Sequence, residues 1–99
     1  MIRKLIFLTV AEDEANDAFD WYEDRESGLG PKFREAVKKT IDKIQTNPYR
    51  FPIVQGSKVR RALVEHFPYC IIFSAEDKSA LILSIFHTSR NPMIWRGRS

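Results

Sequence analysis

The sequence predicts an α+β fold in which a two-helix hairpin packs on one face of an antiparallel sheet. Residues 10–47 repeat apolar side chains at helical spacing, whereas residues 58–87 fall into three apolar runs separated by short polar links. One further apolar run precedes the helical region, so the predicted order is β-α-α-β-β-β, as in other α+β domains. At 99 residues with 43% hydrophobic residues, the chain is expected to form one domain over residues 1–99.

The first strand and the first helix follow one another directly. Residues 2–8 are apolar after a basic start, and no small-residue cleavage site follows, so they predict a strand and not a signal peptide. Thr9 is the expected N-cap of the helix, with Glu12 three residues later as its capping-box partner. Ser27, Gly28 and Gly30 are expected to end this helix. The predicted buried face consists of Ala11, Ala15, Ala18, Phe19 and Tyr22.

The second helix is predicted between a proline that suits its first turn, Pro31, and the stop signal Asn47-Pro48. Its buried face is expected to consist of Phe33, Val37, Thr40, Ile41 and Ile44.

Three strands are predicted after this hairpin. Residues 49–57 are expected to form a loop, because Pro52 and Gly56 interrupt them, and strands then follow at residues 58–65, 69–76 and 79–87. The last two are apolar at nearly every position, which indicates that both of their faces are covered at least in part. One face can take the helices. The other is expected to be half-open or covered by another element.

Charge is distributed unevenly along the chain. Residues 11–26 hold eight acids and one base, so the rest of the chain holds 15 bases and 5 acids. A basic body with one acidic helix predicts a polyanionic partner, with an ordinary solvated surface as the alternative. No apolar run approaches the ~18 residues of a membrane helix, so no membrane contact is expected. The single cysteine, Cys70, fits a cytoplasmic location.

Two groups of residues are candidates for phosphate chemistry. Arg60 and Arg61 are adjacent on a strand, so they are expected to point to opposite faces, and a guanidinium binds phosphate through two parallel hydrogen bonds. His87 at the end of the last strand is suited to proton transfer, and Arg90 follows it closely enough to hold a phosphate. The alternatives are surface arginines on an edge strand and a histidine that only caps the sheet.

The C-terminal segment PMIWRGRS is a candidate nucleic-acid contact. It sets Trp95 among arginines, and aromatic rings between arginines are typical of such contacts. A ring of this size near a terminus usually packs, so Trp95 itself is expected to close the core. Lys58, Arg96 and Arg98 are the expected nucleic-acid-binding residues. The sequence has no Gly-rich phosphate loop, zinc-type cluster, HExxH or GxSxG, so neither a cofactor nor a metal is expected.

Taken in order, these residues resemble the RelE/ParE superfamily of toxins from bacterial type II toxin–antitoxin modules. The resemblance rests on DEANDAFDWYEDRESGLGPKF, NPYRFP, VRRALVEHFPYCIIF and IFHTSRNPMIW, which together cover nearly the whole chain. It implies the β-α-α-β-β-β arrangement and a cognate antitoxin that covers exposed apolar surface and holds the toxin inactive.

The resemblance implies two alternative functions. RelE-like members enter the ribosome and cut mRNA without a metal, through attack of the ribose 2′-hydroxyl on the neighbouring phosphate. ParE-like members inhibit DNA gyrase and are not catalysts, and a toxin that retains only antitoxin binding is a third possibility. The lead expectation is the ribosome-dependent mRNA endonuclease. Its implied catalytic residues are His87, which would transfer the proton, and Arg60, Arg61 and Arg90, which would bind phosphate.

Overall fold

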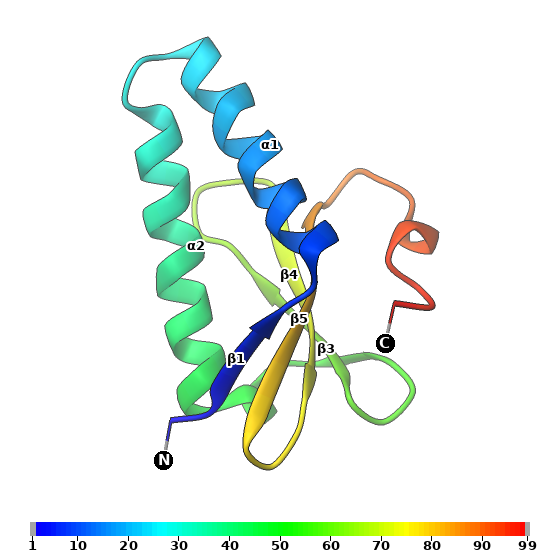
Figure 1. Ribbon diagram of the computed structural model, residues 1–99. Helices are drawn as coiled ribbons and strands as arrows, with labels where there is room; N and C mark the ends of the chain where they lie inside the picture. Colours follow the sequence, from blue (N-terminus) through cyan, green and yellow to red (C-terminus); the bar gives the residue numbers. More distant parts are fainter. Residues whose placement is uncertain (1, 99) are drawn as a thin grey trace.

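The protein folds into a five-stranded sheet with two long helices on one face (Figure 1). The computed structural model describes residues 2–98. The predicted α+β class and the β-α-α-β-β-β order are confirmed, with one additional short strand, β2. The elements are β1 (Lys4–Phe7), α1 (Thr9–Arg25), α2 (Leu29–Thr46), η1 (Pro48–Arg50), β2 (Ile53–Gln55), β3 (Val59–Leu63), β4 (Tyr69–Ala75), β5 (Ser79–His87) and η2 (Pro92–Ile94), where η denotes a 3₁₀ helix.

The strands lie in the order β1-β5-β4-β3-β2, with β1 parallel to β5 and the other neighbours antiparallel. The sheet is therefore mixed, and the prediction of an antiparallel sheet is wrong for β1. The prediction of a plain loop at residues 49–57 is wrong, because this segment contains η1 and the edge strand β2. Pro52 stands just before β2, where a missing N–H removes no ladder hydrogen bond from the strand. A three-residue edge strand between a proline and a glycine gives too short an apolar pattern to be recognised in the sequence.

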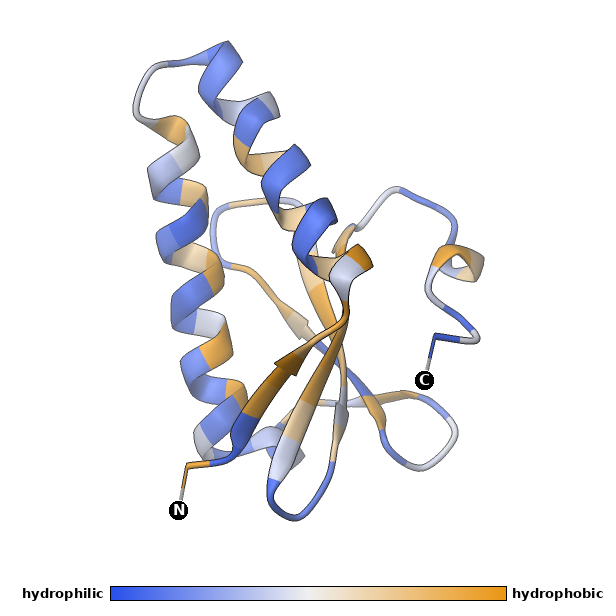
Figure 2. Cartoon of the chain, viewed as in Figure 1, coloured by the Kyte–Doolittle hydropathy of each residue, from blue (hydrophilic) through white to orange (hydrophobic). Residues whose placement is uncertain are grey.

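The helices cover the sheet with the faces that the sequence predicts. The predicted apolar positions are fully buried except Ala15 and Phe19, which are half-buried. On the sheet side the same core takes residues of the central strands, and Figure 2 shows these strands as largely hydrophobic and the two helices as largely hydrophilic with interspersed apolar positions. The sheet residues of this core are Ala62, Val64, Ile71, Phe73, Ala75, Ala80, Ile82 and Ile85.

The start of α1 differs from the predicted capping box. Leu8 is the N-cap, Thr9 is already helical, and no side chain caps the helix. The backbone N–H of Leu8 donates to Ile82 of β5 at 3.0 Å, while its carbonyl accepts from the N–H groups of Ala11 and Glu12. The chain therefore turns from strand into helix at one residue, and this leaves no room for a separate capping turn.

The turn between the helices is held by a carboxylate. Glu23 accepts hydrogen bonds from the backbone N–H of Gly28 at 3.0 Å and of Gly30 at 2.9 Å. Gly28 has a φ of 90°, which glycine adopts without strain. Gly30 is needed for a different reason, since a Cβ there would lie 3.0 Å from the ring of Phe19.

The opposite face of the sheet, here called the outer face, is covered by residues 91–98, here called the C-terminal strap. Trp95 is 4% exposed and packs edge-on against Phe86, with 6.4 Å between ring centroids. Val59, Cys70, Ile72 and Leu83 complete this second core. The apolar character of β4 and β5 on both faces is thus explained within the chain, and Trp95 is part of a core.

No helix within residues 2–98 is long and apolar enough to cross a membrane.

Candidate functional site

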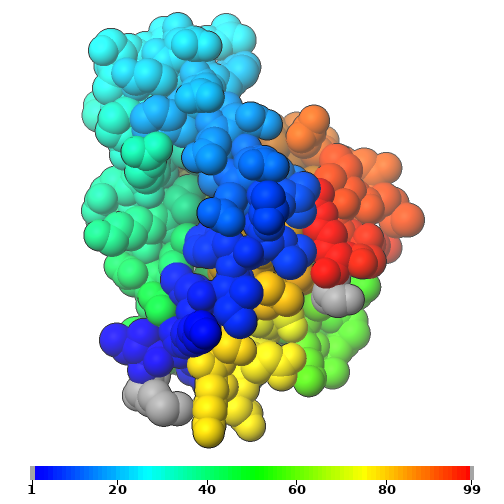
Figure 3. All heavy atoms as spheres, in the orientation of Figure 1, coloured from blue at the N-terminus to red at the C-terminus, as the bar shows by residue number. Residues whose placement is uncertain are grey.

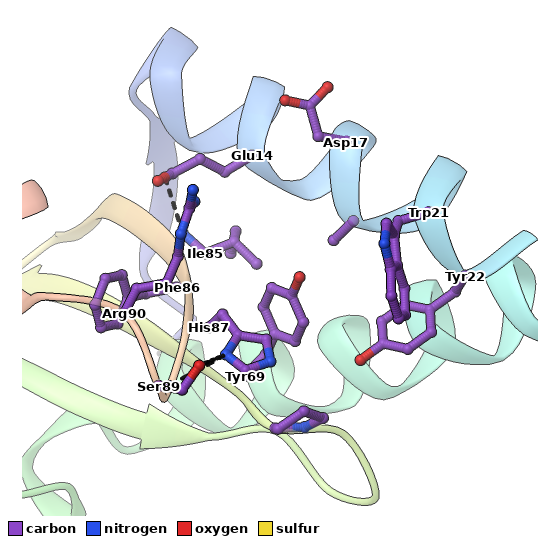
Figure 4. A pocket seen from close by; sticks show the side chains of 12 residues that line it. Glu14, Asp17, Trp21, Tyr22, Tyr69, Ile85, Phe86, His87, Ser89 and Arg90 are labelled. Carbon is purple, nitrogen blue, oxygen red and sulfur yellow. Dashed lines mark hydrogen bonds between the residues drawn. The ribbon is translucent and has the colours of Figure 1, made fainter. Parts of the chain in front are cut away.

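A cleft of about 750 Å³ opens between α1 and the end of the sheet where β4 begins and β5 finishes (Figure 4). The helix supplies carboxylates and aromatic rings to one wall, and the sheet end supplies a histidine and an arginine to the other. The wall from α1 contains Glu14, Asp17, Trp21 and Tyr22, and the wall from the sheet end contains Tyr69, His87 and Arg90.

His87 is held in one orientation by its neighbours. It lies opposite Tyr69 in the β4–β5 register, and the two rings meet at 78° with centroids 5.1 Å apart. Its Nδ1 accepts a hydrogen bond from the Ser89 N–H at 3.1 Å and lies 2.7 Å from the Ser89 hydroxyl. Because Nδ1 accepts from a backbone N–H, the neutral imidazole carries its proton on Nε2.

Tyr69 connects the two walls of the cleft electrostatically. Burial raises the pKa of its hydroxyl, while the nearby Arg90 opposes this rise and Glu14 adds to it. The hydroxyl therefore stays protonated at neutral pH and acts as a hydrogen-bond donor. The cleft thus brings together His87 and Arg90, as the sequence predicts, and adds Tyr69 beside them.

Arg60 lies on the helix-facing side of β3, away from this cleft. Its Nη1 donates to the carbonyl of Phe51 at 2.7 Å, and its guanidinium lies 5.2 Å from the centroid of the Tyr49 ring. Its Nε is buried with no hydrogen-bond partner in the part of the chain that the structure describes. Arg60 therefore fastens the η1 segment to β3.

Arg61 points to the outer face, so the two arginines lie on opposite faces, as strand geometry predicts. The β4 partners of Arg60 and Arg61 are Phe73 and Ile72, whereas the β4 partner of His87 is Tyr69. At the usual rise of a strand, the arginines are displaced from His87 by about 10–13 Å along the strands. The structure does not bring these two arginines together with His87 and Arg90.

Glu14 and Arg98 form an ion pair where β5 has a free edge. Arg98 Nη1 lies 2.9 Å from Glu14 Oε1, and both side chains are 17% exposed. β1 accompanies β5 only as far as Ile82, so the next groups of β5 lack a strand partner on this side. Glu14 Oε1 accepts from the Ser84 hydroxyl at 2.9 Å and the Ile85 N–H at 3.3 Å.

The same ion pair fastens the C-terminal strap. Arg98 also donates to the Leu83 carbonyl at 3.0 Å, and in Figure 3 the strap (red) lies against the first turns of α1 (blue). Sequence reasoning missed Glu14, although a signal is present: Glu14 is three residues after Ala11 and four before Ala18, within the buried stripe of the helix. Arg98 is thus turned inward.

The other two predicted nucleic-acid contacts lie far from one another. Lys58 pairs with Glu76 at 3.1 Å at the opposite end of the sheet from the cleft, and both side chains are largely exposed. Arg96 is exposed on the strap, with its guanidinium 5.9 Å from the Trp95 ring centroid.

Apolar side chains are exposed at the end of β3 and on the strap. Leu63 is 62% exposed at the end of β3, and Met93 and Ile94 on the strap are 63% and 40% exposed. The charge of Arg61 also acts on this face. Burial raises the pKa of the Cys70 thiol to about 11, and the nearby Arg61 partly opposes this rise. We call Arg61, Leu63, Met93, Ile94 and Arg96 the strap surface.

Comparison with known proteins gives one family and one fold. Residues 5–92 match the family described as "ParE toxin of type II toxin-antitoxin system, parDE". Among solved structures, a chain from the "Chromosomal ParDE TA system from P. aeruginosa" superposes with a TM-score of 0.73 at 17% sequence identity, covering 89% of this chain and 98% of that chain. At this identity the likeness concerns the fold alone. No curated protein sequence matches the chain.

Proposed function

This chain belongs to the ParE family of toxins of type II toxin–antitoxin systems, and on that premise we propose that it inhibits DNA gyrase by binding and has no catalytic activity of its own. As a toxin of such a system, it has a cognate antitoxin as its partner. The superfamily that the sequence resembles contains mRNA endonucleases and gyrase inhibitors, and the match to the ParE family favours a gyrase inhibitor. The endonuclease expected from the sequence is therefore no longer the lead interpretation.

The dispersal of the expected catalytic residues is the observation that carries this proposal. A metal-independent nuclease must hold its proton-transfer group and its charge-stabilising groups around one phosphate. Arg60 is engaged by the carbonyl of Phe51, and Arg61 extends over the opposite face of the sheet. Only His87 and Arg90 share the cleft. This arrangement supports a protein that acts by binding.

The strap surface has the composition of a protein interface. Exposed apolar side chains with arginines around them are typical of interface centres, where methionine and arginine are enriched. Met93 is 63% exposed although it belongs to the segment that buries Trp95. The packing of Trp95 therefore holds Met93 at the surface. We assign gyrase contact to this surface.

The first experiment is a supercoiling assay with purified gyrase, relaxed plasmid and ATP. The toxin should inhibit supercoiling in a dose-dependent way, and His87→Ala should inhibit equally well. Met93→Ser and Arg96→Glu should each weaken inhibition, by about fivefold or more if they contact the target directly. Ile2→Ser is the matched control, because Ile2 is 70% exposed and lies next to β1, outside the strap surface.

One observation favours an endonuclease as the second candidate, namely that His87 and Arg90 share the cleft with Tyr69. Primer extension on mRNA from a reconstituted translation reaction tests it. Intact mRNA together with inhibited gyrase supports our proposal. Uninhibited gyrase together with new mRNA 5′ ends that disappear for His87→Ala would refute it.

A further inference from the structure

The cleft between α1 and the sheet end lies outside the strap surface, and its two walls differ in charge. The wall from α1 carries two carboxylates, Glu14 and Asp17, whereas the opposite wall carries Arg90 and the imidazole of His87. From this geometry we propose that the cleft receives an arginine side chain of the antitoxin, bound between these carboxylates and the ring of Trp21. The inference rests on the antitoxin partner and not on gyrase.

The charge of α1 is the first reason for a cationic occupant. Five of its carboxylates are exposed, and no ion pair within residues 2–98 neutralises any of them. Like charges four residues apart on a helix repel each other, so a basic partner segment would reduce the repulsion among these carboxylates. These residues are Glu12, Asp13, Asp17, Asp20 and Asp24.

The aromatic wall is the second reason. Trp21 is 52% exposed, and its ring already accepts the guanidinium of Arg25 at 4.2 Å from the centroid. Tyr22 meets the same ring edge-on at 5.1 Å between centroids, which fixes its orientation. A tryptophan face beside carboxylates is a favourable setting for a guanidinium, because the ring and the charges both attract the cation.

Glu14 supplies the third reason. Its Oε1 accepts the hydrogen bonds from Arg98, Ser84 and Ile85, whereas its Oε2 accepts none from the described part of the chain. Glu14 also lines the cleft, so Oε2 is the acceptor that it can offer to a partner. A guanidinium suits this position, because its several N–H donors can reach two carboxylates at once.

The alternative occupant is an anionic segment bound by Arg90 and His87. Arg90 and Glu14 both act on Tyr69, since Arg90 lowers and Glu14 raises the pKa of its hydroxyl. An incoming carboxylate would therefore meet the repulsion of Glu14 and Asp17 at close range. A cation is opposed by Arg90 and by Arg25, which lies over the Trp21 ring, but Glu14 and Asp17 attract it.

The test uses the purified toxin–antitoxin complex and two matched charge reversals. Asp17→Arg should weaken the complex by about tenfold or more in a competition binding assay, because it sets like charges together in the cleft. Asp24→Arg makes the same change of charge on the same helix, outside the cleft, and should weaken it by less than about threefold. Equal weakening by both variants would mean general electrostatic attraction and would overturn the proposal.

A peptide titration of the free toxin tests the chemistry of the occupant. The probe is an acetylated, amidated tri-arginine, and the control is the tri-citrulline peptide, in which a neutral urea replaces each guanidinium. Tri-arginine should shift the NMR signal of the Trp21 indole N–H, identified by its absence in Trp21→Phe, and Asp17→Asn should weaken this binding about threefold. An unshifted Trp21 signal, or an equal effect of tri-citrulline, contradicts the proposal. No gyrase is present in either assay, so their outcomes are independent of the supercoiling result.

Discussion

Removal of the Glu14–Arg98 ion pair should destabilise the protein more than its place near the surface suggests. The pair joins α1 to the strap at 2.9 Å, and both side chains are 17% exposed. A hydrogen bond to a charged group contributes about 1.5–3 kcal/mol, and partial burial protects this one from solvent screening. Arg98→Met also removes the bond to the Leu83 carbonyl, which is worth about 1 kcal/mol.

A double-mutant cycle isolates the contribution of the pair. Glu14→Gln, Arg98→Met and the double variant are unfolded in urea, and the free energies give a coupling energy that we expect near 2 kcal/mol. In a domain of this size, such a loss lowers the melting temperature by roughly 8–16 °C.

The matched control is the same cycle at Lys58 and Glu76. Their nitrogen–oxygen distance is 3.1 Å, close to that of the buried pair, but the side chains are 60% and 48% exposed. Exposed pairs contribute about 0.2–1 kcal/mol. Equal coupling energies for the two pairs would refute the view that burial at the β5 edge gives Glu14–Arg98 its strength.

Three further predictions concern packing and ionisation. Gly30→Ala should lower the free energy of unfolding in urea by about 1–3 kcal/mol, since the new Cβ would press on the Phe19 ring at 3.0 Å. Trp95→Ala should lower it by about 3–5 kcal/mol and increase ANS fluorescence. Trp95→Phe should cost less, because it also removes a buried indole N–H that has no acceptor in the described chain. Burial raises the pKa of Cys70 from its ordinary 9.0 to about 11, so the folded state holds this proton more tightly than the unfolded state. Stability should therefore fall as pH rises from 9 to about 11, and Cys70→Ala should remove that part of the fall.

The fold could be predicted from the sequence wherever the signal is local. Apolar residues at helical spacing, such as Phe33 and Val37, predict the helices. Long apolar runs predict β4 and β5. The packing of Trp95 was expected from the size of its ring, but the surface that it covers could not be predicted. That surface depends on residues distant in the sequence, such as Phe86.

The candidate site was predictable in part for the same reason. His87 and Arg90 are neighbours in sequence, so a common location follows from the end of one strand. The positions of Arg60 and Arg61 relative to them depend on strand register, which is a long-range property. Glu14 is one of eight acids in residues 11–26, and only its place in the buried stripe of the helix distinguishes it from the carboxylates that face solvent.

The parallel pairing of β1 with β5 has a consequence for biosynthesis. Lys4 has Ser79 as its partner, so the first strand can pair only after β5 has been synthesised. Contacts so distant in sequence slow folding, because closure of the large loop precedes any stabilisation. The strap surface combines β3 with residues beyond β5, so it too is assembled late. The surface that we propose for binding therefore forms only after the residues that follow β5 have been synthesised.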